Sequence, residues 1–187
     1  MDKVDRVYRY LAATVTKGIT FDNQNDGKLC AYADASYATH ADCKSHSGVV
    51  IKLGKHAGPI LVKSTKQKII TRSSTEAELV ALACCLDEVR VIRKLLEELG
   101  LPQKPSVVYQ DNTSSMMMTE KGDSTEKKAK HMRVRFAFIK EHIEKKDISL
   151  VYIPTGEMVA DALTKPLCGK KFREFRSQLL NEHPTEW

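Results

Sequence analysis

Four acidic residues, Asp34, Glu78, Asp111 and Asp161, lie in separated segments of this 187-residue chain, each beside an expected end of a strand or helix. Open sheets covered by helices collect their functional groups at such ends. Carboxylates brought together repel one another, so a cluster of this kind normally holds a hard cation such as Mg²⁺. Two such ions about 4 Å apart can activate water and stabilise the leaving oxygen of a phosphodiester. In a basic protein, the four acids indicate chemistry on nucleic acid.

Each acid also has an ordinary structural interpretation. Asp34 could cap a turn after a strand, and Asp111 could be the N-cap of a following helix. Asp161 could be an exposed helix acid. Glu76 is expected to serve a capping box at the start of a long helix, which leaves Glu78 as the better ligand, but helical spacing does not separate the two sharply. The pattern alone does not show that the four carboxylates meet.

Hydrophobic periodicity and turn residues predict the elements that must position these acids. Runs typical of strands occur at 28–36, 48–53, 59–64, 106–110 and 148–153. Helical patterns occur near the N-terminus within 1–20, at 73–100, from about 113, at 129–145, at 157–164 and at 170–180. The first three strands form a plausible antiparallel meander. The order predicts an α/β protein with a mixed sheet, an antiparallel hairpin start and covering helices.

Length and composition favour one ordinary domain with flanking pieces. Hydrophobic residues make up 42% of the chain, enough for a packed core. The turn-rich stretch at 21–27 makes a natural boundary after the first segment. No apolar run is long enough to cross a bilayer, so we expect no membrane partner. The five cysteines suit reduced thiols in an intracellular protein.

The net charge of +6 is compatible with a polyanionic partner, and segment 121–135 concentrates the positive charge. A solvated loop and helix face would explain this segment equally well. A second cluster, His40, Cys43 and His46, has spacings that could suit zinc, but a fourth ligand is not evident nearby.

Several stretches together resemble the ribonuclease H domain of Ty1/copia-type LTR retrotransposon polyproteins, and the likeness covers nearly the whole chain. The matching stretches are YADASYA (32–38), KSHSG (44–48), STKQ (64–67), SSTEAEL (73–79), QDN (110–112), KHMRVRFAFIKE (130–141) and VADALTKPL (159–167). The pair SSTEAE and ADALTKPL, found in order, is specific, whereas QDN alone would be weak.

The resemblance implies a ribonuclease H-like fold, with a five-stranded mixed sheet flanked by helices. It also implies two Mg²⁺ ions, with Mn²⁺ as a substitute, held by the four acids. Asp34 would bridge both ions, and Asp161 would complete the site of the ion that activates water. Glu78, the second glutamate of STEAE, would hold the ion at the leaving oxygen together with Asp111. The implied reaction cuts the RNA strand of an RNA–DNA hybrid and leaves a 5′-phosphate and a 3′-hydroxyl.

The implied organisation has three parts. Residues 1–22 would end the connection from a reverse transcriptase, 23–167 would form the ribonuclease H domain, and 168–187 would form a C-terminal helix and tail. The implied partners are the hybrid and the reverse transcriptase domain of the same polyprotein, in a cytoplasmic virus-like particle. The side chains expected to contact backbone phosphates are Lys127, Lys128, Lys130, His131, Arg133 and Arg135.

Two departures from the family pattern accompany the resemblance. Loop 154–160 lacks the histidine that many relatives carry before the last acid, and Ala137 stands where a second histidine is common. His131 is therefore interpreted as a substrate-side or structural residue.

One rival to an active nuclease is an inert module of the same fold that binds hybrid and supports the polymerase, although an inert copy has no reason to keep four mutually repelling acids. An integrase-like enzyme would show the order D, D, E rather than D, E, D, D.

Overall fold

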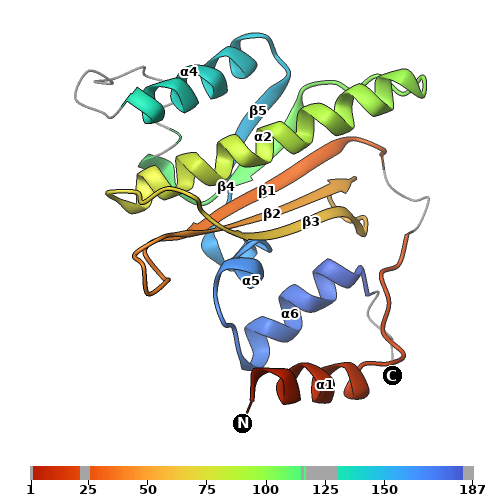
Figure 1. Cartoon of the computed structure of the whole chain (residues 1–187). Helices are drawn as coiled ribbons and strands as arrows, with labels where there is room; N and C mark the ends of the chain where they lie inside the picture. Colours follow the sequence, from red (N-terminus) through yellow and green to blue (C-terminus); the bar gives the residue numbers. More distant parts are fainter. Residues whose placement is uncertain (1, 22–25, 115, 117–129, 183–187) are drawn as a thin grey trace.

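A mixed sheet forms the centre of the molecule. The computed structural model describes residues 2–21, 26–114, 116 and 130–182. In this part of the chain, five strands pair in the order β3-β2-β1-β4-β5 (Figure 1). Their bounds are β1 (Leu29–Ser36), β2 (His46–Leu53), β3 (Pro59–Lys66), β4 (Ser106–Gln110) and β5 (Ile148–Tyr152). The first three strands pair antiparallel, while β4 pairs parallel with both β1 and β5, which confirms the predicted mixed sheet and its hairpin start.

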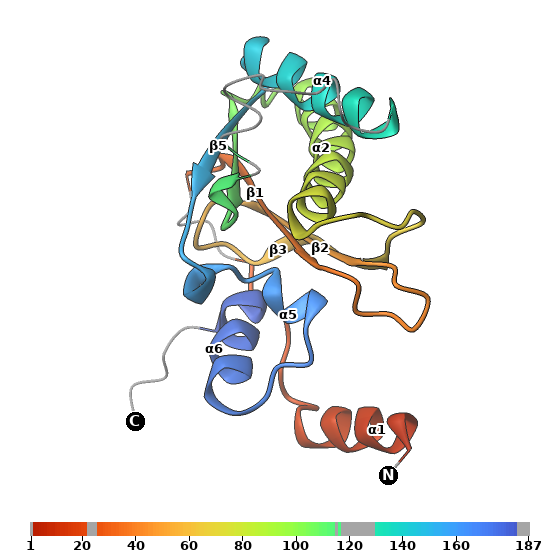
Figure 2. The same cartoon turned by 90° about the vertical axis from the view of Figure 1, so that its left-hand side faces the viewer.

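Helices cover both faces of the sheet (Figures 1 and 2). One face carries α2 (Ser74–Glu98) and α4 (Lys130–Glu144), and the other carries α5 (Asp161–Thr164) and α6 (Gly169–Leu180). The N-terminal helix α1 (Lys3–Ala13) lies beside α6 (Figures 1 and 2). Among the described helices, none combines the length and the apolar character needed to cross a membrane.

The helix predicted at 157–164 is wrong over its first half. Helical structure there is limited to the 3₁₀ turn η2 (Thr155–Glu157) and the single turn α5. Met158 separates the two, because its backbone lies outside the helical region (φ −75°, ψ 88°), and Met158, Val159 and Ala160 are all buried. The helix expected from about residue 113 is seen at Thr113 and Ser114, and most of its remainder lies outside the described residues.

Both faces of β1 are buried, which explains its nearly continuous apolar sequence. Ala31 and Ala33 belong to the core beneath α2, whereas Cys30 and Tyr32 belong to the core on the side of α5 and α6. Because side chains alternate along a strand, Asp34 shares the α5 side with Cys30 and Tyr32. The carboxylate therefore lies where an apolar side chain is expected.

A capping arrangement begins α2 and sets the position of Glu78. The Ser73 hydroxyl accepts a hydrogen bond from the amide of Glu76 at 3.2 Å. The Glu76 carboxylate accepts from the amide of Arg72 at 2.8 Å, one residue before the amide used in a capping box. The helix thus begins at the predicted place, and Glu76 is occupied in holding its first turn.

The ends of the described chain are joined on the α6 side of the sheet. The amide of Thr20 donates to the carbonyl of Leu180 at 2.9 Å, and the rings of Tyr10 and Phe172 meet edge to face. Phe175 of α6 is buried against the sheet. The boundaries predicted near residues 22 and 167 remain predictions.

Gly48 allows α5 to approach the sheet. A Cβ atom at this position would lie 2.7 Å from the carbonyl oxygen of Ala160 and 2.9 Å from Cγ2 of Thr164. Real Cβ atoms do not approach other atoms so closely, and the first contact is with backbone. Glycine inside a strand often marks such an approach.

We expect Gly48→Ala to lower the free energy of unfolding by about 1–3 kcal/mol, because α5 must shift away from β2. Urea denaturation followed by circular dichroism measures the change. Gly18→Ala is the matched control, because a Cβ there meets nothing within 4 Å, and it should change stability by less than about 0.5 kcal/mol. Equal stability of the two variants would contradict the close approach of α5.

Candidate metal centre

Two of the acids lie at the carboxyl ends of adjacent parallel strands. Tyr32 of β1 pairs with Tyr109 of β4. Asp34 and Asp111 each follow two residues later, so continuing this register sets them side by side. Asp111 comes directly after β4, and its Oδ2 accepts a hydrogen bond from the Thr155 hydroxyl at 2.8 Å. The loop after β5, the third parallel strand, therefore reaches the same edge of the sheet.

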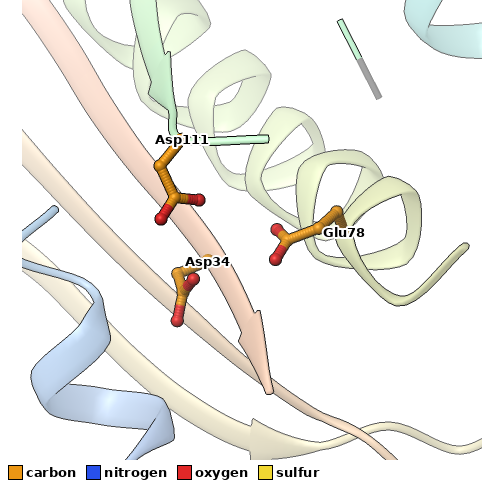
Figure 3. Close-up of side chains that lie close together, drawn as sticks. All are labelled: Asp34, Glu78 and Asp111. Atoms are coloured by element: carbon orange, nitrogen blue, oxygen red, sulfur yellow. The ribbon is translucent and has the colours of Figure 1, made fainter. Parts of the chain in front are cut away.

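Glu78 reaches this edge from the second turn of α2. Its carboxylate accepts hydrogen bonds from the Gln110 side-chain amide at 3.4 Å and from the backbone of Ala35. One carboxylate oxygen from each of Asp34, Glu78 and Asp111 lies within 4.8 Å of the other two. Figure 3 shows the three side chains coming together from β1, α2 and the end of β4. Three distant segments thus supply one cluster of oxygen ligands.

The carboxylates are in an electrostatically unfavourable environment. Asp34 and Glu78 are only 1% and 5% exposed. Burial, together with the charges of Asp34 and Asp111, raises the pKa of Glu78 to about 9. Burial also raises the pKa of Asp34 to about 6, although the Thr164 hydrogen bond and the Lys165 ammonium oppose this shift. Full ionisation of the cluster therefore requires a compensating cation.

The fourth acid, Asp161, lies beside this cluster but outside the group of three. It is the first residue of α5 and is 1% exposed. Its Oδ1 contacts the ammonium of Lys165, and its Oδ2 lies 3.0 Å from the ammonium of Lys171. The Lys165 ammonium is also 4.0 Å from Oδ2 of Asp34. The two lysines neutralise Asp161, because a buried carboxylate without a partner would be costly.

The three clustered acids fit a hard divalent cation. Their donor atoms are all carboxylate oxygens, which Mg²⁺ and Mn²⁺ prefer and which suit a thiolate-seeking metal poorly. The buried, mutually repelling arrangement is the feature of this structure that indicates a bound cation. Asp161 could join the set if its carboxylate left the two lysines.

The cluster considered for zinc makes a different set of contacts. Nε2 of His40 lies 2.9 Å from Nδ1 of His46, and Nε2 of His46 lies 2.8 Å from the Ser64 hydroxyl. Ser64 in turn donates to the carbonyl of Leu163 in α5 at 2.7 Å. Cys43 is exposed, and within the described ranges it joins no group of metal ligands. The two histidines thus form a hydrogen-bonded chain that leads to α5.

The predicted phosphate-binding residues are described only in part. Lys127 and Lys128 lie outside the described residues, whereas the others lie in the first two turns of α4. Lys130, His131 and Arg135 line a cavity of about 740 Å³ between α4 and α2, and Arg133 is exposed. The apolar part of the cavity's lining comes from Ala83, Val134 and Phe138.

Several residues at the site were missed by sequence reasoning. Thr164 and Lys165 stand within the quoted stretch VADALTKPL, three and four residues after Asp161 respectively. This spacing would bring them to one side of a helical turn, and it could have revealed them. Lys171 and Thr155 carry no comparable signal, because their contacts depend on how α6 and the loop after β5 pack.

Comparison with known proteins supports the same family as the sequence motifs. No family model matches the chain. Over 181 residues, 96% of its length, the chain is 35% identical to the retrovirus-related Pol polyprotein from transposon RE1 of Arabidopsis thaliana. Over 183 residues it is 33% identical to the corresponding polyprotein from transposon TNT 1-94 of Nicotiana tabacum. The chain spans only 12% and 13% of these two relatives.

Solved structures share the fold at low sequence identity. The crystal structure of LC11-RNase H1 in complex with RNA/DNA hybrid has a TM-score of 0.54 and 21% identity, covering 73% of this chain and 93% of that chain. The N-terminal RNase H domain of rv2228c from Mycobacterium tuberculosis has a TM-score of 0.54 and 15% identity, covering 81% of this chain and 98% of that chain. The chain is thus a homologue of one segment of the Pol polyproteins of Ty1/copia-type transposons, and it has the ribonuclease H fold.

Proposed function

We propose that this chain is a ribonuclease H, a metal-dependent endonuclease that hydrolyses the RNA strand of RNA–DNA hybrids during reverse transcription. The observation that carries the proposal is the convergence of Asp34, Glu78 and Asp111 at the carboxyl ends of parallel strands. The homology to Pol polyproteins supports the setting, and the neighbour solved with RNA/DNA hybrid supports the substrate. The products would carry a 5′-phosphate and a 3′-hydroxyl.

The metal ligands would be Asp34, Glu78, Asp111 and Asp161, and the cofactor would be two Mg²⁺ ions, with Mn²⁺ as a substitute. Bound ions of this kind supply a nucleophilic water at neutral pH and stabilise the leaving oxygen of the phosphodiester. The protein holds the ligands in place: Gln110 donates to Glu78 and Thr155 donates to Asp111. For Asp161 to act as a metal ligand, its carboxylate must leave the ammonium groups of Lys165 and Lys171 and bind the metal ion instead.

Substrate binding would use the positive charge at the start of α4. Lys130, His131 and Arg135 would contact backbone phosphates, which gives salt-sensitive affinity without reading base sequence. Arg133, Lys127 and Lys128 would make further contacts with backbone phosphates. The reverse transcriptase of the same polyprotein would be the protein partner, and the place of action would be a cytoplasmic virus-like particle.

One observation favours a second candidate, an inert hybrid-binding module of the same fold. Lys165 and Lys171 occupy the carboxylate of Asp161, and Lys165 also approaches Asp34. In an inert module these ammonium groups would permanently take the place of a metal. The two candidates differ in whether metal ions support turnover.

Asp34→Asn and Asp111→Asn should each reduce cleavage of a labelled RNA–DNA hybrid by at least about a thousandfold, because each removes a charge that holds metal. Gel analysis of the RNA strand in Mg²⁺ measures this loss. Asp5→Asn in α1, remote from the cluster, is the control and should cut at the wild-type rate. Wild-type protein that binds hybrid but leaves it uncut in both Mg²⁺ and Mn²⁺ would favour the inert module.

Metal-free protein should become less stable as pH rises. The pKa of Glu78 is raised from its usual 4.5 to about 9, so the folded state binds more protons than the unfolded state between these values. The resulting stabilisation is complete below pH 4.5 and is lost as pH rises through about 9. Urea unfolding in EDTA at several pH values, compared with Glu78→Gln, measures this contribution.

Relative to Glu78→Gln, the free energy of unfolding of wild type should therefore decrease steadily from pH 5 to pH 9. Added Mg²⁺ should raise the melting temperature of wild type more at high pH, because ligands must lose protons to bind metal. Parallel pH profiles for the two proteins would show that Glu78 does not carry the raised pKa.

Lys130→Ala should weaken hybrid binding and reduce the slope of log affinity against log salt by about 1, as expected for one phosphate contact. Fluorescence anisotropy with Ca²⁺ in place of Mg²⁺ measures the slope without turnover. Lys94→Ala, an exposed lysine near the far end of α2, is the control and should leave the slope unchanged. Identical slopes for all three proteins would remove Lys130 from the binding surface.

A further inference from the structure

We propose that Thr164 is a positioning residue that orients the carboxylate of Asp34 for metal binding, an inference that rests on the proposed function. The Thr164 hydroxyl donates a hydrogen bond to Oδ2 of Asp34. Both side chains are buried, and 130 positions separate them in the chain. A carboxylate with one oxygen held in this way cannot rotate freely about its last bond.

The single turn α5 presents two relevant side chains to the cluster. Asp161 and Thr164 are three residues apart, so they lie on one side of the turn, and both are buried. Asp161 brings the fourth carboxylate beside the cluster, while Thr164 contacts the acid on β1. One short element thereby fixes Asp34 and Asp161 relative to each other.

The sheet is shaped to admit this contact. Asp34 of β1 pairs directly with Gly48 of β2. Residues opposite each other in an antiparallel pair project from the same face, so the missing side chain of Gly48 leaves room on the face where Asp34 projects. Cγ2 of Thr164 would lie 2.9 Å from a Cβ at position 48. Only glycine there lets Thr164 sit within reach of Asp34.

A second contact holds the same turn from its other flank. The Ser64 hydroxyl on β3 donates to the carbonyl of Leu163, the residue before Thr164. Nε2 of His46 approaches the same hydroxyl at 2.8 Å. Because Ser64 uses its hydrogen for the carbonyl, His46 must donate to Ser64, and its Nδ1 then accepts from His40 if His46 is neutral. The turn is thus held by β1 through Thr164 and by β3 through Leu163.

Removing the Thr164 hydroxyl while keeping its shape isolates the hydrogen bond. Thr164→Val preserves the branched side chain but leaves buried Oδ2 of Asp34 without this donor. Thr164→Ser keeps the hydroxyl and loses the methyl group. Loss of a group that orients a metal ligand typically costs about 10–100-fold in metal affinity or activity.

The experiment measures metal binding and cleavage in parallel on the full chain. Isothermal titration with Mn²⁺ gives affinity without turnover, and hybrid cleavage across a Mg²⁺ series gives the concentration for half-maximal rate. We expect Thr164→Val to weaken Mn²⁺ binding and raise that Mg²⁺ concentration about tenfold, while Thr164→Ser stays close to wild type. Thr14→Val is the control. Thr14 directly follows α1, and the substitution removes a hydroxyl that donates to the Tyr10 carbonyl, so it should change neither value.

The outcomes separate this inference from the proposed function. If folded Thr164→Val binds Mn²⁺ with wild-type affinity, the positioning role is overturned. If Thr164→Ser loses as much Mn²⁺ affinity as Thr164→Val, the role is also overturned, because the effect then comes from packing of the methyl group. If thermal unfolding in EDTA shows that Thr164→Val does not fold, Thr164→Ala replaces it under the same criteria. Wild-type protein that neither binds Mn²⁺ nor cuts hybrid would overturn the proposed function itself, before any variant is compared.

Discussion

Buried carboxylates that repel one another set the conditions that the sheet, the helices and the nearby lysines of this protein must meet. Asp34, Glu78 and Asp111 come within 4.8 Å of one another, and two of them are almost fully buried. Burial and like charge raise the pKa of Glu78 to about 9. A fold that keeps such a cluster must stabilise it by rigid surroundings and by positive charge, since water cannot solvate it.

The sheet topology supplies the rigid surroundings. Parallel pairing of β1 with β4 and of β4 with β5 sends three carboxyl ends to one edge, and the antiparallel pairing of β2 with β1 sets Gly48 beside Asp34. Helix α2 is held at its first turn by Ser73 and Glu76, so Glu78 enters the cluster from a fixed position. Each acid therefore depends on a different long-range pairing.

The α5 side supplies the positive charge. Lys165 and Lys171 bind Asp161, and Lys165 also approaches Asp34, so the ammonium groups do part of what a bound cation would do. This arrangement links stability to function in the proposed enzyme. There, metal ions that bind Asp161 would have to compete with two lysines, whereas one carboxylate oxygen from each of the other three acids already lies within 4.8 Å of the other two.

Local patterns in the sequence determined the strands, the long helix with its capped start, and the placement of four acids beside element ends. Periodicity and turn residues act over a few positions, so they predict such features well. The same patterns overextended the helix at 157–164, because apolar periodicity does not reveal that the backbone leaves the helical region at Met158, where the loop packs into the core. The sequence did not predict that three of the acids cluster, that Asp161 binds lysines, or that Thr164 reaches Asp34 across 130 positions. Those contacts arise from strand register and from the approach of α5 to Gly48, which depend on packing between segments distant in the chain.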